Sequence, residues 1–170
     1  SRKLRAIADP FVAAVHPLPK VAILPLIMVI FGIGEAPKVV VIALAAFFPL
    51  LIGAMAGVRQ INPIYFEVAK NYGASVAKVF ARVVLPGSLP LVLSGVRQSL
   101  NTALLLAIAV EMVSAQRGLG AMVWFAWETL RVEQIYVALA VTAALGVSLN
   151  ALLRGLAVFL APWQVEGGKS

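Results

Sequence analysis

Long apolar stretches alternate with short polar ones along the chain, and the apolar stretches have the length of membrane spans. Residues 39–58 contain no charged side chain. As a helix they would rise about 30 Å, which matches the hydrocarbon core of a bilayer. Three further apolar stretches occupy residues 18–34, 88–110 and 135–153. We therefore expect four spans. The first contains Pro25 and is short enough to form a re-entrant or core segment instead.

The composition agrees with a membrane location. Of the 170 residues, 62% are hydrophobic and 12% are charged, and the mean hydropathy is +0.98. A soluble domain needs more polar surface than this, and a chain of this length has no outer layer that could cover several apolar helices. We expect an all-α integral membrane protein with a single domain over residues 1–170. Because cysteine is absent, disulfides and thiolate metal sites are excluded.

The charges predict an orientation. Lys and Arg outnumber Asp and Glu before the first span, between the second and third spans, and after the fourth. Of the two remaining connections, the first balances Glu35 against Lys38, and in the second Glu111, Glu128 and Glu133 outnumber Arg117 and Arg131. Since Lys and Arg concentrate in cytoplasmic loops, both termini and residues 59–87 should be cytoplasmic. The formal net charge of +7 then reflects membrane topology and contact with lipid, and it requires no nucleic acid partner.

The polar segment at residues 59–87 is too long for a turn and is patterned like two short helices. Asn62 and Pro63 form a helix start, with Asn as the cap and Pro at the first helical position. Gly73 should end this helix with a left-handed cap. Ala74 and Ser75 can start a second helix, in which Val76, Val79 and Phe80 share a face. Pro86 and Pro90 are expected to end the segment before the next span.

One motif in this segment resembles a known one. The pattern is Glu-Ala-Ala, three residues, Gly, nine residues, Ile, one residue and Leu-Pro. It is similar to the cytoplasmic coupling loop in the permease subunits of bacterial binding-protein-dependent ABC importers. Val68 replaces the second-position Ala, and Val83 replaces Ile. The six matching or conservative positions are Glu67, Ala69, Gly73, Val83, Leu85 and Pro86. An interfacial helix that only rests on anionic lipid is the alternative interpretation of this segment.

The resemblance extends over most of the chain. Residues 17–38, 94–120 and 130–146 look like the nitrate, sulfonate and taurine branch of these permeases. This implies a helical bundle of the type I importer class, like that of methionine importers. Such subunits usually have about six spans, so four spans with a cytoplasmic start imply that about two N-terminal spans are missing from this chain. The implied partners are cytoplasmic ATPase subunits, a second permease subunit in a homodimer, and an extracytoplasmic solute-binding protein.

Few residues could carry chemistry inside the spans. Arg97 and Asn101 lie one helical turn apart and could line a translocation pathway, because charged residues within spans often mark pathways. Alternatively, Arg97 reaches the cytoplasmic interface or pairs with a neighbouring helix. Glu111 could orient the outer mouth or occupy a solvated helix end. The only histidine, His16, is followed by Pro17 and Pro19 and has one nearby acid, Asp9, and no cysteine, so we expect no metal and no cofactor.

These residues predict transport rather than catalysis. No Gly-rich phosphate loop is present in the sequence, so ATP must be bound by another chain. A lone Arg in the pathway favours an anion, such as nitrate, an alkanesulfonate or taurine, moved by alternating access. An intramembrane enzyme is a first alternative, although the spans supply no paired ionisable groups. A structural or assembly subunit of another membrane complex is a second alternative.

Overall fold

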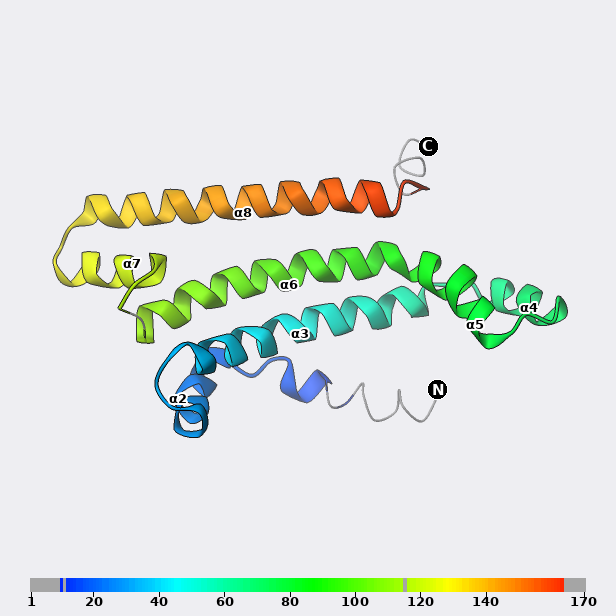
Figure 1. Ribbon diagram of the computed structural model, residues 1–170, viewed down its shortest axis with the longest axis horizontal. Coiled ribbons are helices and arrows are strands. Elements are labelled where there is room, and N and C mark those ends of the chain that lie inside the picture. Colours follow the sequence, from blue (N-terminus) through cyan, green and yellow to red (C-terminus); the bar gives the residue numbers. More distant parts are fainter. Residues whose placement is uncertain (1–9, 11, 115, 164–170) are drawn as a thin grey trace. The chain divides into compact units, whose positions relative to one another are not determined.

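The computed structural model describes residue 10, residues 12–114 and residues 116–163, and this part of the chain is helical without a β-strand. The all-helical prediction is therefore confirmed. Figure 1 shows the order of the elements along the chain. They are α2 (Lys20–Phe31), α3 (Glu35–Arg59), α4 (Pro63–Asn71), α5 (Val76–Val79), a π-helical turn η1 (Phe80–Val84), α6 (Leu85–Ser114), α7 (Leu119–Glu128) and α8 (Val132–Leu160).

Three helices among the described residues are long and apolar enough to cross a membrane: α3, the continuous helix Val76–Ser114, and α8. They contain the predicted spans 39–58, 88–110 and 135–153. Within the predicted span 18–34, the helix α2 has only 12 residues. It rises about 18 Å, which is shorter than the hydrocarbon core, so α2 by itself does not reach across.

The described helices form two compact units. The first comprises residues 1–48 and 101–142, and the second comprises residues 49–100 and 143–170. In the first unit, Leu24, Val41 and Val110 are fully buried against one another, with α2, α3 and α6 each contributing one residue. The sole histidine belongs to this unit, where the His16 ring lies 6.0 Å from the Phe48 ring. The Lys20 amine donates a hydrogen bond to the His16 backbone carbonyl oxygen and lies over the Phe48 ring.

In the second unit, α3 and α6 approach so closely that their backbones touch. A Cβ atom added to Gly53 would lie 2.7 Å from the Gly95 Cα atom, and one added to Gly57 would lie 2.7 Å from the Ser88 carbonyl oxygen. Small residues allow this approach between membrane helices, where close packing replaces the hydrophobic driving force. The two helices that flank residues 59–87 are therefore held together at their ends nearest this segment.

The expectation that Pro86 and Pro90 end the polar segment before the next span is wrong. The helix that begins at Val76 passes through η1 directly into α6, and Pro90 lies inside α6. α5 and α6 are joined by the π-helical turn η1, in which the Leu85 N–H donates a hydrogen bond to the Phe80 carbonyl oxygen five residues earlier. Pro86, which has no N–H to donate, lies directly after this turn and inside the continuous helix.

Candidate functional site

The segment at residues 59–87, which we name the coupling loop, begins with a capped helix. The Asn62 side chain accepts a hydrogen bond from the Ile64 N–H at 3.0 Å, and Pro63 occupies the first turn of α4. This cap satisfies a backbone donor that no residue within the helix could pair. The helix start predicted from the sequence is confirmed.

Gly73 ends α4 with a positive φ of 63°. The Ala74 N–H donates to the Ala69 carbonyl oxygen at 2.9 Å, and the Gly73 N–H donates to the Lys70 carbonyl oxygen at 3.0 Å. This pair of bonds is the Schellman arrangement, in which a left-handed residue closes a helix. The predicted left-handed cap is confirmed. A Cβ atom added to Gly73 would meet nothing within 4 Å, so only the backbone conformation of the isolated chain requires glycine here.

The second helix of the coupling loop starts as the sequence predicts. The Ser75 hydroxyl accepts a hydrogen bond from the Lys78 N–H at 3.4 Å and caps α5. The chain then continues through η1 into α6. Because the second arm of the loop is one uninterrupted helix with a membrane-spanning segment, a movement at α5 can pass to α6 without a flexible joint between them.

The coupling loop exposes a large apolar surface. No residue of α4, α5 or η1 is buried. Six large side chains between Ile64 and Phe80 are widely exposed: Ile64 50%, Tyr65 60%, Val68 45%, Tyr72 87%, Val76 87% and Phe80 57%. Exposed apolar patches of this kind mark surfaces that bind a partner or a membrane.

The residues of the sequence motif divide into two groups in the structure. Glu67, on α4, and Gly73, shortly after it, are both exposed. Glu67 has no hydrogen bond or ion pair within the described residues. Val83 and Pro86 lie at the far end of the loop and line a cavity. Ala69 serves the turn through its carbonyl oxygen, and Leu85 is half-exposed at the start of α6.

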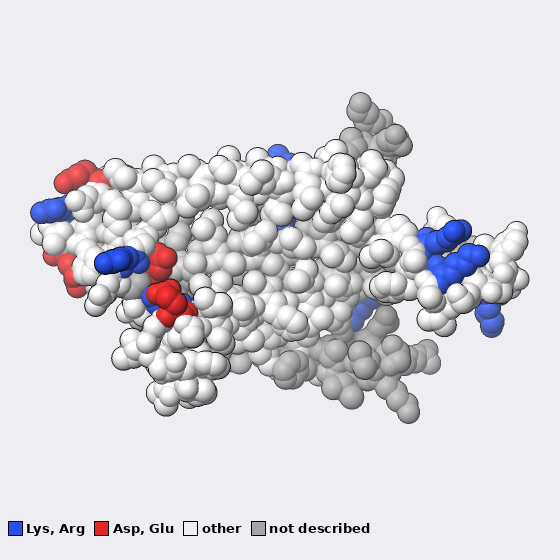
Figure 2. Space-filling model, in the orientation of Figure 1, with Lys and Arg blue, Asp and Glu red and all other residues white. Residues whose placement is uncertain are grey.

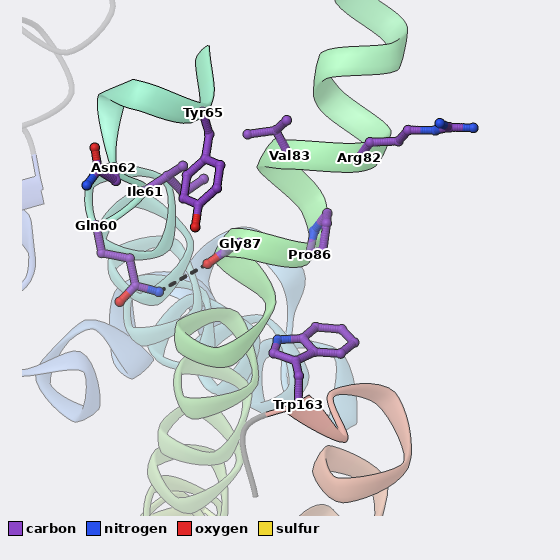
Figure 3. Close-up of a pocket in the computed structure, with 9 residues that line it drawn as sticks. All are labelled: Gln60, Ile61, Asn62, Tyr65, Arg82, Val83, Pro86, Gly87 and Trp163. Atoms are coloured by element: carbon purple, nitrogen blue, oxygen red, sulfur yellow. Dashed lines mark hydrogen bonds between the residues drawn. The ribbon is translucent and has the colours of Figure 1, made fainter. Parts of the chain in front are cut away.

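The cavity has a volume of about 540 Å³ and lies at the base of the coupling loop. In Figure 3, Tyr65 and Trp163 point into it from different elements, while the guanidinium group of Arg82 extends outward from its edge. The Gln60 side-chain N–H donates to the Gly87 carbonyl oxygen at 3.1 Å and joins the two ends of the loop. The lining consists of Gln60, Ile61, Asn62, Tyr65, Arg82, Val83, Pro86, Gly87 and Trp163. Sequence reasoning missed this cavity, because no periodicity relates Trp163 to residues so far back along the chain.

The loop is also basic. Residues 59–87 contain Arg59, Lys70, Lys78 and Arg82 against the single acid Glu67. Figure 2 shows Lys and Arg side chains gathered on the projecting coupling loop, with no acidic side chain visible there on the face drawn. The loop therefore presents positive charge beside its apolar surface.

Arg97 lies in α6, and part of its side chain is enclosed. The residue is partly exposed, yet its Nε atom is buried without a hydrogen-bond partner in the described part of the chain. The Ser99 hydroxyl is in the same condition. Asn101 follows one turn after Arg97 on the same helix and is half-buried. An enclosed guanidinium N–H without a partner is a donor that a partner helix, lipid or anion could satisfy.

Glu111 has a specific partner that the sequence did not suggest. Its carboxylate accepts a hydrogen bond from the Gly120 N–H at 2.9 Å, at the start of α7. A Cβ atom on Gly118 or Gly120 would collide with this side chain or with the backbone of α6. In this structure Glu111 therefore fixes the turn between α6 and α7. The only signal in the sequence was the pair of glycines nearby.

Comparisons with known proteins agree along nearly the whole chain. A family model described as "Binding-protein-dependent transport system inner membrane component" matches residues 1–165. The taurine transport system permease protein TauC of Escherichia coli (strain K12) is 39% identical over 166 residues, which are 98% of this chain and 60% of that protein. SsuC of the same strain, provisionally named for aliphatic sulfonates transport, is 35% identical over 146 residues, 86% of this chain and 56% of that protein.

A third relative is named for the transport of a solute that is not a sulfonate. The riboflavin transport system permease protein RibX of Chloroflexus aurantiacus is 35% identical over 165 residues, which are 97% of this chain and 62% of that protein. The chain thus spans about three fifths of the length of the curated relatives it matches. Relatives of similar identity carry the names of chemically different solutes.

Proposed function

Because the chain belongs to the family of binding-protein-dependent transport system inner membrane components, we propose that it is a membrane subunit of an ATP-driven importer. In this role its spans form part of a translocation pathway, which opens alternately to the two sides of the membrane. ATP is hydrolysed by separate cytoplasmic subunits. A solute-binding protein delivers the solute from outside, and a second permease subunit, in a homodimer, completes the pathway.

The observation that carries this proposal is the exposed apolar surface of the coupling loop. Val68, on α4, and Tyr72, directly after it, are 45% and 87% exposed. A short capped helix with such a face can fit a groove on another protein and move with it as a rigid body. Glu67 and the lysines would orient the docked helix, and Gly73 would allow close backbone approach.

The arms of the coupling loop suit the transmission of movement. Within the second unit, α3 and α6 touch at Gly53 and Gly95, and the Gln60–Gly87 hydrogen bond ties the loop ends together. A force on the loop would therefore move the adjoining parts of both helices together. Such rigid-body movement is one of the recurrent ways in which proteins convert ligand binding into a change of state.

The solute is proposed to be a small anion, such as nitrate, an alkanesulfonate or taurine. Support comes from the enclosed and unpartnered Arg97 Nε atom, since a guanidinium group binds sulfonate and nitrate oxygens well. TauC is named for taurine transport, whereas RibX is named for riboflavin transport. We therefore assign contact with the anion to the face of α6 that carries Arg97 and Asn101. Glu111 has a different role, which is to hold the turn between α6 and α7.

The proposal also includes an orientation. The chain is a multi-pass membrane protein, and the distribution of Lys and Arg supports a coupling loop and two termini in the cytoplasm. This is the side on which ATP is available. The turn between α6 and α7 would then face outward, toward the solute-binding protein.

Removal of the exposed apolar surface tests the proposal. We expect the double variant Val68→Ser and Tyr72→Ser in the full-length permease to lose co-purification of the co-expressed ATPase subunit by at least about tenfold, because the apolar contact is lost. Tyr136→Ser is the matched control, since Tyr136 is 69% exposed but lies on α8. Undiminished ATPase recovery with the double variant would contradict the docking role.

A further inference from the structure

The cavity at the base of the coupling loop has the features of a binding site for an amphiphile. Its volume of about 540 Å³ lies within the range of small-molecule sites, about 300–1,000 Å³. Trp163 is 48% exposed and Tyr65 is 60% exposed, so large aromatic surfaces remain uncovered. Ile61 and Pro86 add apolar lining. A wholly polar ligand would leave this apolar surface unused.

The rim of the cavity supplies hydrogen-bond donors and a positive charge. The Gln60 amide gives one N–H to Gly87, and the Asn62 carbonyl oxygen caps α4, which leaves the Asn62 amide N–H groups available as donors. Arg82 extends outward from the edge (Figure 3). Four basic residues against one acid make the surrounding loop positive. Guanidinium and amide donors of this kind suit phosphate oxygens.

The position of the cavity in the chain determines which amphiphile can reach it. It lies where α3 ends at Arg59 and α6 begins at Leu85, and both helices belong to segments long and apolar enough to span the bilayer. The ends of spanning helices lie at the level of the lipid headgroups. Tryptophan and tyrosine are enriched at this depth, and clusters of Lys and Arg beside a span attract anionic lipid.

We propose that this cavity binds the headgroup region of one anionic phospholipid, such as phosphatidylglycerol. The glycerol backbone and the first part of an acyl chain pack against Trp163, Ile61 and Pro86. The phosphate lies at the rim near Arg82. This site does not require ATPase docking or transport, and it couples the coupling loop to the end of α8 through a shared lipid.

Fluorescence of Trp163 tests the site directly. Residues 1–170 contain three tryptophans, so the substitutions Trp124→Phe and Trp127→Phe leave Trp163 as the only indole within them, and any tryptophan elsewhere in the full-length permease is replaced by phenylalanine as well. This protein is reconstituted in phosphatidylcholine vesicles that contain an increasing fraction of phosphatidylglycerol with brominated acyl chains, which quench a tryptophan in contact with them. Brominated phosphatidylcholine at the same fractions is the lipid control. We expect phosphatidylglycerol to reach half-maximal quenching at a fraction about fivefold lower, the effect of roughly one basic residue.

Two variants distinguish lipid binding in the cavity from a general attraction of anionic lipid to the positive charge of the loop. Arg82→Gln should remove most of the preference for phosphatidylglycerol, whereas Lys78→Gln, which removes the same charge from a residue outside the cavity lining, should retain it. An equal loss with both variants would mean attraction to the loop in general and would overturn the site. The absence of any preference in the parent protein would overturn it as well.

Two further arms identify the occupant. Inorganic phosphate should not reverse the quenching beyond the effect of potassium chloride at equal ionic strength, and a specific reversal would assign the cavity to a free phosphate anion instead. Addition of the ATPase subunit should leave the lipid preference in place. If the ATPase abolishes quenching by phosphatidylglycerol, the cavity belongs to the protein partner, and the lipid assignment is wrong.

Discussion

Gly73 is the residue on which the shape of the coupling loop most directly depends. Its φ of 63° places it in the left-handed region, where a residue with a Cβ atom is disfavoured by about 1 kcal/mol or somewhat more. The two hydrogen bonds of the turn close α4 only in this conformation. The same position projects into open space, where the proposed ATPase groove would lie.

We expect Gly73→Leu to abolish ATPase association and transport, because it strains the turn and holds the loop away from its partner. Glu67→Ala should weaken both only partially, since an exposed charge contributes at most about 1 kcal/mol. Gly73→Asn is the matched control for the backbone, because Asn tolerates the left-handed region, and it should retain more association than Leu. ATPase co-purification and solute uptake measure the effects. Normal transport by Gly73→Leu would show that the loop only rests on lipid.

Arg97 carries the prediction about the solute. If the solute is an anion, Arg97→Ala should lower transport by at least about tenfold while expression and assembly remain near normal, because a charge-assisted contact is lost. Arg97→Lys should recover only part of the rate, since Lys lacks the planar fork of donors. Uptake is compared with the amount of assembled complex in each variant. Normal uptake by Arg97→Ala would identify Arg97 as an interface residue.

Local signals in the sequence predicted the local geometry of these residues. Asn62, Gly73 and Ser75 act on backbone groups within about five positions, so their roles follow from capping rules alone. Glu111 was not predictable in this way. Its partner Gly120 is nine positions away across a turn, and nothing in the spacing fixes the direction in which that turn folds.

At the scale of elements, the contact between α3 and α6 determines how the loop is held. A Cβ atom on Gly53 would lie 2.7 Å from the Gly95 Cα atom and 2.8 Å from the Leu91 carbonyl oxygen. Both atoms belong to backbone, which cannot move aside as a side chain can. Gly155 on α8 has nothing within 4 Å of an added Cβ atom and offers a direct contrast.

We expect Gly53→Ala to lower the melting temperature of the purified protein, because the overpacking penalty of about 1–3 kcal/mol exceeds the gain of about 1 kcal/mol in helix propensity. Gly155→Ala should leave the melting temperature unchanged or slightly raise it. A melting temperature for Gly53→Ala at or above that of the parent would mean that the two helices do not touch as described.

Hydrophobic length predicted where the long helices lie but not how they join. The apolar stretches 39–58, 88–110 and 135–153 fall inside α3, α6 and α8, because a helix of about 20 apolar residues is the simplest structure for such a stretch in lipid. The π-helical turn before α6 was missed, since proline usually indicates a helix end. The tertiary packing of Gly87 against Ile61 at this point has no counterpart in a local pattern.

At the scale of the whole molecule, we propose that the coupling loop lies in the cytoplasm and is covered there by an ATPase. The basic charge of residues 59–87 supports the cytoplasmic location of the loop. The exposed aromatic and aliphatic side chains of α4 and α5 support the docking of a protein partner such as the ATPase. These two observations are independent of each other, because one concerns charge along the sequence and the other concerns burial in the fold.

The most direct test measures the accessibility of a single cysteine at the loop, in the cysteine-free chain. The variant Lys70→Cys of the full-length permease should react with a membrane-impermeant thiol reagent in inverted membrane vesicles but not in intact cells, and the bound ATPase should slow this reaction by at least about tenfold. Gln116→Cys, in the turn before α7, is the control and should react from the outside regardless of the ATPase. Labelling of the Lys70→Cys variant from the outside of intact cells, or a rate that is unchanged by the ATPase, would contradict the proposed role of the loop.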